Sequence, residues 1–351
     1  MRLRLQFRRY RLPLRGPVRT AHGLWSVRQG IVVRLEDEAG SVGFGEAAPI
    51  PEFGMETVDE VESAVRELGE WIEAAALPPL GQDGMSRAGW PASLVNAFAA
   101  ARAPLIGEPE IRTEKVVGVA ALVPAGRSAL AAITEMGRTG FRIFKWKVGV
   151  AAAGEELALL EDALAALPPG GRLRLDANGA WNRRTAERWL ERCADAPVEF
   201  VEQPAFARAA EGSAQRKQAD DLVRGLAEDY PTPIALDESL VGDGDIERWL
   251  GAGWPGIYVV KPALLANPLR AVGRLARAGA DVVFSSALET AVGARAALRV
   301  ALGWEGKSRA LGFGVWPLFA DGRFDGPRAA PFLRESDIDC LNAEDVWNAL
   351  I

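Results

Sequence analysis

The chain has 351 residues, of which 49% are hydrophobic and 25% charged, and its formal net charge is −6. This length allows two domains or one large barrel with an appendage, and the negative charge offers no basic field to attract nucleic acid or an anionic membrane. A single histidine, His22, and two cysteines without a CxxC spacing exclude a histidine-rich zinc site and argue against a Ser-His-Asp triad.

The sequence also carries signals about location. Its two cysteines, Cys193 and Cys340, fit a reducing cytoplasm. Its apolar runs are shorter than the roughly 18 residues of a membrane span, and residues 1–7 alternate like a strand where a signal peptide would have an apolar block. We therefore expect a cytoplasmic protein without a membrane partner. The sequence does not define the oligomeric state.

Residues 1–112 have the pattern of an α+β capping domain. Thr57 and Glu60 have the spacing of a capping box at a helix start. The predicted elements are strands at 30–36 and 42–46, joined by a Glu-Asp-Glu-Ala-Gly turn, and helices at about 56–76 and 90–103.

The pattern changes at residue 113, where short apolar runs begin to alternate with helical stretches. Alternation of this kind predicts parallel strands with right-handed crossovers, and about eight strands in roughly 200 residues favour a TIM-type barrel over 113–320. Residues 321–351 are expected to return to the capping domain. The predicted strands lie near 116–123, 141–148, 172–177, 198–203, 233–237, 256–261, 281–286 and 311–316, and predicted helices include 153–166, 182–194, 218–228 and 268–278.

Five of the apolar runs end in charged residues. A charge at the end of a buried strand is costly unless it is paired or bound to a metal, and the carboxyl ends of barrel strands form the active site. The five clusters therefore predict one shared site. They are Lys145-Trp146-Lys147, Asp176-Ala177-Asn178, Glu202-Gln203, Asp237-Glu238 and Lys261-Pro262.

The carboxylates predict a metal. Asp176, Glu202 and Asp237 come from three consecutive strands and would repel one another in a desolvated site unless a divalent cation neutralises them. Oxygen ligands point to Mg²⁺, Mn²⁺ or Ca²⁺, and Mg²⁺ is the default at such an open site.

The lysines predict a base. Side chains in a strand alternate with period two, so Lys145 and Lys147 share a face. A lysine near a divalent cation and a second ammonium is expected to have a lowered pKa and to act as a general base. A metal that faces two lysine-bearing strands suits proton abstraction next to a carboxylate, with Lys147 and Lys261 on either side.

Each cluster has a structural explanation when it is taken alone. Asp176-Ala177-Asn178-Gly179 is typical of a turn, Lys145-x-Lys147 of a solvent-facing strand, and Asp237-Glu238-Ser239 of a helix N-cap. Their order at successive strand ends is what favours a site. His22 fits a plain loop or a lid over the substrate. Gly251-x-Gly253-x-x-Gly256 precedes a strand and contains Pro255, which argues against a dinucleotide fingerprint.

The clusters together resemble the muconate-lactonising-enzyme subgroup of the enolase superfamily, and within it the o-succinylbenzoate synthase family. The resemblance covers nearly the whole chain and implies a capping domain, a (β/α)7β barrel and a C-terminal return. One departure is that Glu202 is followed by Gln203-Pro204, where many relatives have Glu-Pro. The closer match rests on the stretches 43–49, 174–178, 235–239 and 285–290.

The resemblance implies a hydro-lyase whose partner is a small carboxylate substrate. The reaction would be the Mg²⁺-dependent dehydration of 2-succinyl-6-hydroxy-2,4-cyclohexadiene-1-carboxylate to 2-succinylbenzoate, on the route to menaquinone or phylloquinone. Lys147 would remove the proton and Lys261 would stabilise the dienolate, while the lysine that returns the proton stays open. Metal ligands would be Asp176, Glu202 and Asp237, and substrate-binding or supporting residues Lys145, Arg174, Asn178, Glu238, Ser285 and Ser286.

Two other functions stay open at this stage. A racemase of N-acylamino acids or an epimerase of dipeptides would use the same metal, with the lysines on opposite faces of the substrate. A non-catalytic binding protein on a barrel scaffold would be expected to have lost ligands or lysines, and all five clusters are intact.

Overall fold

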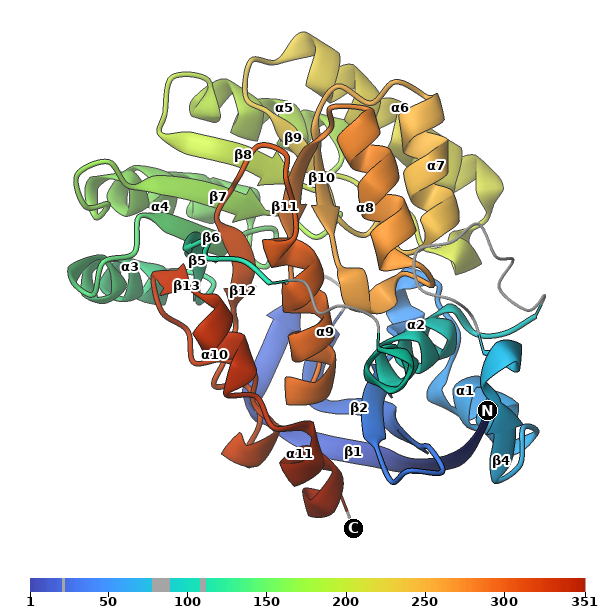
Figure 1. Cartoon of the computed structure of the whole chain (residues 1–351). Coiled ribbons are helices and arrows are strands. Elements are labelled where there is room, and N and C mark those ends of the chain that lie inside the picture. The colour runs from blue at the N-terminus through green and yellow to red at the C-terminus, as the bar shows by residue number, and fades with distance from the viewer. Residues whose placement is uncertain (21–22, 78–88, 108–111, 351) are drawn as a thin grey trace.

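The computed structural model describes residues 1–20, 23–77, 89–107 and 112–350. His22, for which a lid or a plain loop was predicted, lies outside the described residues. Figure 1 shows a barrel with a separate antiparallel sheet across one end. Among the described helices, none is both long and apolar enough to cross a membrane.

The N-terminal region forms a four-stranded antiparallel sheet in the order β3-β2-β1-β4, with two helices packed on it. The capping box is confirmed, because the Thr57 side chain accepts from the backbone of Glu60 and the Glu60 side chain accepts from the backbone of Thr57. The elements are β1 (Arg2–Thr20), β2 (Gly23–Glu36), β3 (Val42–Ala47), α1 (Val58–Arg66), β4 (Trp71–Glu73) and α2 (Ala92–Arg102).

The helix predicted at 56–76 is wrong in its second half. Helix α1 ends at Arg66, and Gly69 has a positive φ of 73° that turns the chain. Residues Trp71–Glu73 then pair with Arg2–Arg4 of β1 as a short strand. Pairing with a distant part of the chain overrides the local helical pattern.

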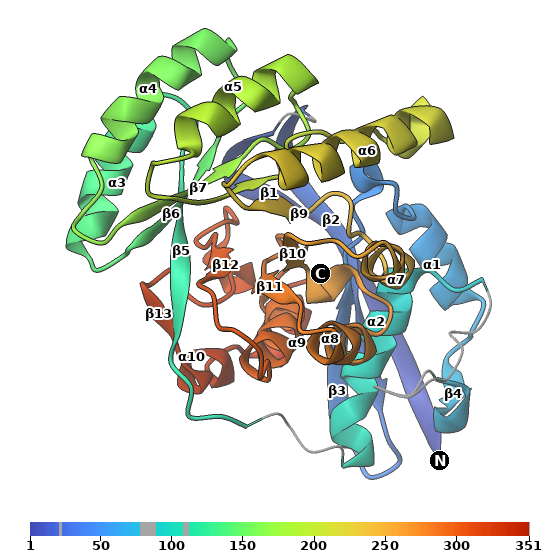
Figure 2. The ribbon, with the colours of Figure 1, turned by 90° about the horizontal axis from the view of Figure 1, so that it is seen from above.

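The second region confirms the predicted barrel. Eight parallel strands pair in the order β11-β10-β9-β8-β7-β6-β5-β12, and a bridge between Ser285 and Gly312 joins the two ends of this series. One helix follows each of the first seven strands, and Figure 2 shows these helices on the outside of the strands. The strands are β5 (Val117–Val123), β6 (Ile143–Lys147), β7 (Arg172–Asp176), β8 (Val198–Glu202), β9 (Ile234–Leu236), β10 (Ile257–Val260), β11 (Asp281–Phe284) and β12 (Leu311–Gly314).

Amphipathic helices cover the barrel because their apolar faces pack on the nearly continuous apolar strands. Trp146 on the outer face of β6, for example, meets Trp189 of α5 edge to face. These helices are α3 (Ser128–Arg138), α4 (Ala153–Ala165), α5 (Arg183–Cys193), α6 (Ser213–Asp229), α7 (Asp243–Gly251), α8 (Pro268–Arg277) and α9 (Ala291–Leu302).

The C-terminal segment contains β13 (Phe332–Leu333), α10 (Glu335–Asp339) and α11 (Ala343–Ala349). Arg8 of β1 donates to the carbonyl oxygens of Trp347 and Leu350, and its guanidinium lies 4.5 Å from the centre of the Trp347 ring. Figure 1 shows α11 beside β1. The predicted domain limits at 112/113 and 320/321 stay predictions.

A buried carboxylate joins the capping sheet to the barrel. Glu46 of β3 accepts hydrogen bonds from the Tyr10 hydroxyl at 2.5 Å, from the backbone N–H of Thr290 at 3.0 Å and from that of Gly293 at 2.9 Å. The last two donors are at the start of α9, where unpaired N–H groups and the helix dipole favour a negative charge. Glu46 thereby fixes the capping sheet on the first turn of α9.

Candidate active site

The charged clusters meet at the carboxyl ends of the barrel strands. Strand pairing places Lys147 opposite Asp176, and Asp176 opposite Glu202. Asp237 and Lys261 directly follow β9 and β10, the next two strands in the sheet. The structure therefore brings together the five clusters that are far apart in the sequence.

Each of the three carboxylates has a lysine partner. Lys145 Nζ lies 3.0 Å from Asp176 Oδ2 and 2.6 Å from Glu202 Oε1. Lys147 Nζ lies 3.0 Å from Asp176 Oδ2, and Lys261 pairs with Asp237. Asp176, Glu202 and Asp237 are buried, with at most 6% of each exposed, so these pairs supply the compensation that buried charge requires.

The electrostatic balance differs among these groups. Burial opposes ionisation of Asp176, but the charges of Lys145 and Lys147 hold its pKa well below the usual range. Burial raises the pKa of Glu202 in spite of Lys145. Burial alone would lower the pKa of Lys145, yet the charges of Asp176 and Glu202 raise it above the usual range. For Lys261, burial and then the Lys145 charge lower the pKa well below its usual value.

The donor set fits a divalent cation by its chemistry. It offers three buried carboxylates at the ends of neighbouring strands, and hard cations such as Mg²⁺ prefer oxygen ligands. In the described part of the chain, no three Asp, Glu, His or Cys side chains are close enough together to hold a metal. Lysine ammonium groups contact the carboxylate oxygens that a cation would use.

Two amide side chains, Asn178 and Gln203, form hydrogen bonds that position the charged residues. The Asn178 Oδ1 atom accepts from Lys147 Nζ at 2.7 Å, and its Nδ2 donates to Glu238 Oε1 at 2.8 Å. Gln203 Oε1 accepts from the backbone N–H of Asp237 at 2.8 Å, and its Nε2 donates to the Ser239 hydroxyl at 2.9 Å. Sequence reasoning treated Gln203 only as a departure from relatives and missed that it positions Asp237.

A cavity of about 300 Å³ lies above the charged groups. Lys145, Lys147, Asp176, Asp237 and Lys261 line it from the barrel. Its other walls are apolar or come from the capping region and from the segments after β11 and β12, and include Arg15, Val18, Trp25, Ile50, Phe53, Ser285, Ser286, Leu288, Val315 and Leu318.

Two predicted substrate contacts, Ser285 and Ser286, do line this cavity. Their hydroxyl groups already have partners: Ser285 Oγ donates to the Gly312 carbonyl at 3.2 Å, and Ser286 Oγ donates to Glu289 Oε2 at 3.0 Å. Both serines thus shape the wall as well as facing the cavity.

Arg174, a third predicted contact, does not line the cavity. It is almost fully buried and donates to Glu199 Oε2 and to the Ala310 carbonyl, each at 2.8 Å, with its guanidinium over the Phe200 ring. Arg174 lies two residues before Asp176 on the same face of β7. Its side chain is therefore one layer deeper in the barrel than that of Asp176. The structure therefore places Arg174 in a supporting ion-pair network.

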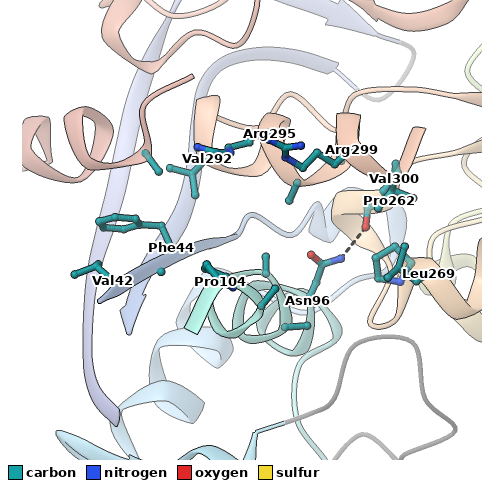
Figure 3. A pocket seen from close by; sticks show the side chains of 18 residues that line it. Val42, Phe44, Asn96, Pro104, Pro262, Leu269, Val292, Arg295, Arg299 and Val300 are labelled. Atoms are coloured by element: carbon teal, nitrogen blue, oxygen red, sulfur yellow. Dashed lines mark hydrogen bonds between the residues drawn. The ribbon is translucent and has the colours of Figure 1, made fainter. Parts of the chain in front are cut away.

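A second cavity of about 300 Å³ lies between the capping region and the barrel helices. Figure 3 shows Phe44 and Asn96 on one side and Val292, Arg295 and Arg299 on the other. None of the three predicted metal ligands lines this cavity, so it is separate from the charged cluster.

Comparisons with known proteins show the family. The family model described as "Enolase C-terminal domain-like" matches residues 128–329, and the one described as "MenC, N-terminal domain" matches residues 1–86. An o-succinylbenzoate synthase from Thermosynechococcus vestitus is 38% identical over 94% of this chain and 95% of its own. One from Thermobifida fusca is 31% identical over 81% of this chain and 74% of its own.

Solved structures show the same similarity. The o-succinylbenzoate synthase from Thermosynechococcus elongatus BP-1, which was solved with magnesium in the active site, superimposes with a TM-score of 0.75 at 36% identity and covers 99% of this chain and 100% of its own. The L-Ala-D/L-Glu epimerase from Bacillus subtilis has a TM-score of 0.77 at 20% identity, over 94% of this chain and 95% of its own. The epimerase comparison shows a shared fold.

Proposed function

The chain belongs to the enolase superfamily and, within it, to the o-succinylbenzoate synthases, and on this premise we propose that it dehydrates 2-succinyl-6-hydroxy-2,4-cyclohexadiene-1-carboxylate to 2-succinylbenzoate. The observation that carries the proposal is the meeting of three buried carboxylates and three lysines at one barrel mouth, beneath a cavity whose remaining walls are mainly apolar.

Asp176, Glu202 and Asp237 hold the metal in this proposal. Bound Mg²⁺ supplies the positive charge that stabilises negative charge as it develops on the substrate carboxylate. Lys145, which bridges Asp176 and Glu202, offsets the repulsion between these two ligands. Asn178, Glu238 and Gln203 restrict the side chains around them.

Lys147 acts as the base. Its Nζ takes the proton from the ring carbon that bears the carboxylate, and the electron pair of that C–H bond is delocalised over the carboxylate and the ring as a dienolate. The electron pair then forms the aromatic double bond as the neighbouring C–O bond breaks, and the hydroxyl leaves as water with the proton that Lys147 took. Lys261 follows β10, with β7, β8 and β9 between it and Lys147, so it faces the ring from the other side. Its ammonium stabilises the electron-rich intermediate through charge and cation–π attraction.

The test is turnover by purified protein with Mg²⁺, followed as the rise in ultraviolet absorbance of the aromatic product. Activity should disappear with EDTA and return with Mg²⁺. Folded, metal-loaded protein that makes no aromatic product would refute the proposal. Solvent proton exchange at an amino-acid α-carbon in the same preparation would instead favour the racemase or epimerase alternative.

The role of Lys147 has its own test. Lys147→Ala should lower kcat by several orders of magnitude, because its neighbour Lys145 is held between Asp176 and Glu202, whose charges raise the pKa of Lys145 and make it a poor base. Lys217→Ala is the matched control, since Lys217 is exposed on α6 and pairs with Asp221. Near-normal turnover by Lys147→Ala would remove it as the base.

A further inference from the structure

The cavity above the charged cluster contains a fourth positively charged side chain, which comes from the capping region. Arg15 of β1 lines the same cavity as Lys145, Lys147 and Lys261. None of the sequence patterns identified it, because it lies in a strand of the capping sheet and far from the five clusters.

The backbone around Arg15 is fixed on the rim of the barrel. The Arg15 N–H donates to the Leu318 carbonyl at 2.8 Å, the Ala320 N–H donates to the Pro13 carbonyl at 3.0 Å, and Leu14 forms a bridge with Phe319. These contacts tie β1 to the segment after β12, which forms part of the cavity wall. Leu14 is buried, so the next side chain, Arg15, points to the opposite side.

Arg15 also differs from the lysines in its pairing. Each lysine of the cavity is held by at least one carboxylate of the cluster. The Arg15 guanidinium is exposed and makes no ion pair or side-chain hydrogen bond with the described residues. A guanidinium presents its N–H groups in a planar fork that matches a carboxylate.

We infer that Arg15 binds the carboxylate at the end of the substrate's succinyl side chain and makes the enzyme selective for a dicarboxylate. This inference rests on the proposed function, whose substrate carries one carboxylate on the ring and one at the end of a short flexible chain. With the substrate's ring carboxylate at the charged cluster, its succinyl side chain extends toward the capping region. Val18, Trp25 and Leu288 provide apolar walls for its methylene groups.

The experiment compares two product-like ligands on the magnesium-loaded protein. 2-Succinylbenzoate has both carboxylates, whereas 2-butanoylbenzoate lacks the one at the end of the chain. Arg15→Gln should weaken binding of 2-succinylbenzoate by about tenfold or more, as expected for loss of a charge-assisted hydrogen bond. Binding of 2-butanoylbenzoate should not change. In turnover, KM should rise while kcat stays within a few-fold, and Arg15→Lys should restore part of the loss.

Arg11→Gln is the matched control, because Arg11 is exposed on the same strand and does not line this cavity. Unfolding temperatures of both variants show whether the strand is intact. Equal effects of Arg15→Gln on the two ligands, or no effect on either, would overturn the inference while leaving the dehydration intact. Wild-type protein that discriminates between the ligands but produces no 2-succinylbenzoate would overturn the proposed function and keep the carboxylate site.

Discussion

The lysine between two carboxylates shows how the barrel tolerates so many buried charges. Lys145 lies within 3.0 Å of both Asp176 and Glu202, and neither acid is exposed by more than 1%. Breaking a buried ion pair by removing one partner is expensive, since the other charge is left without compensation. The stability of the protein should therefore depend on Lys145 whenever no metal is bound.

Lys145→Met should lower the free energy of unfolding by about 3 kcal/mol in EDTA, because Glu202 loses its ammonium partner. Saturating Mg²⁺ should recover much of this loss, since a cation on the same carboxylates replaces the missing charge. Urea unfolding with and without Mg²⁺ measures both effects, with Lys217→Met as the exposed control. A variant as stable as wild type in EDTA would contradict this account.

Glu289 is the residue that should make stability depend on pH. It is fully buried beside Glu46, and burial, with the Glu46 charge adding to it, raises the pKa of Glu289 to about 7. An unfolded chain has the ordinary pKa near 4.5. The folded protein therefore binds more protons between these values, and its stability falls as pH rises from about 4.5 to 7.

Glu289→Gln should remove that dependence, because the amide is uncharged at every pH and has the shape of the protonated acid. Near pH 5 the variant and wild type should have similar free energies of unfolding. At pH 8 the variant should be more stable, by on the order of 3 kcal/mol if the whole shift is expressed. Parallel urea titrations across this range test the sign, and a wild-type advantage at pH 8 would show that Glu289 is ionised without penalty.

At the scale of elements, the contact between β3 and α2 depends on two glycines. A Cβ atom on Gly43 would lie 1.8 Å from the Ala101 carbonyl oxygen, and one on Gly45 would lie 1.9 Å from that of Ala97. The glycines are two residues apart on a strand and the alanines four apart on a helix, and both spacings are about 6 Å. The helix can therefore lie along the strand at backbone contact distance.

Gly45→Ala should push α2 away from the sheet and lower the free energy of unfolding by about 2 kcal/mol, as expected for overpacking against a rigid backbone. Gly154→Ala in α4 is the control, because nothing lies within 4 Å of its Cβ position. That variant should be unchanged or slightly more stable, since alanine favours a helix. Thermal unfolding of both variants decides, and equal stability would show that α2 can shift freely.

The barrel strands could be predicted because each is an apolar run of a few residues between helical stretches, which is a local property. The end of α1 could not, because β4 exists only through its pairing with β1, about 70 residues away. The same limit applies at the site. The period of two along a strand correctly placed Lys145 on the same face as Lys147, and Arg174 on the same face as Asp176. It does not show how deep in the barrel a side chain lies. Arg174 is held at a deeper level by its hydrogen bonds to Glu199 and to the carbonyl of Ala310.

Across the whole molecule, the capping region supports the barrel mouth. Arg28 of β2 is buried and donates to the carbonyl oxygens of Leu288 and Ala287, each at 3.2 Å, and to that of Pro49 at 2.8 Å. Leu288 has a positive φ of 61° and lines the site cavity. The capping region thus holds a strained part of the cavity wall in place, in addition to covering it.

Asn96 of α2 connects the capping region to the segment after Lys261. Its Nδ2 donates to the Pro262 carbonyl at 2.7 Å and to the Leu265 carbonyl at 2.6 Å, and the side chain is 7% exposed. Figure 3 shows the first of these bonds crossing from α2 to the barrel. Because Pro262 directly follows Lys261, the position of this lysine depends on a helix outside the barrel.

Asn96→Ala should therefore affect stability and catalysis together. Loss of the two hydrogen bonds should lower the free energy of unfolding by about 2 kcal/mol, because buried carbonyl oxygens lose a donor. The kcat should fall further than KM rises, because a displaced Lys261 stabilises the intermediate less well than it did before. Asn348→Ala, on the exposed side of α11, is the same substitution without these contacts and should leave both quantities unchanged. An Asn96→Ala protein that is destabilised but keeps full kcat would show that the capping helix supports the fold without positioning Lys261.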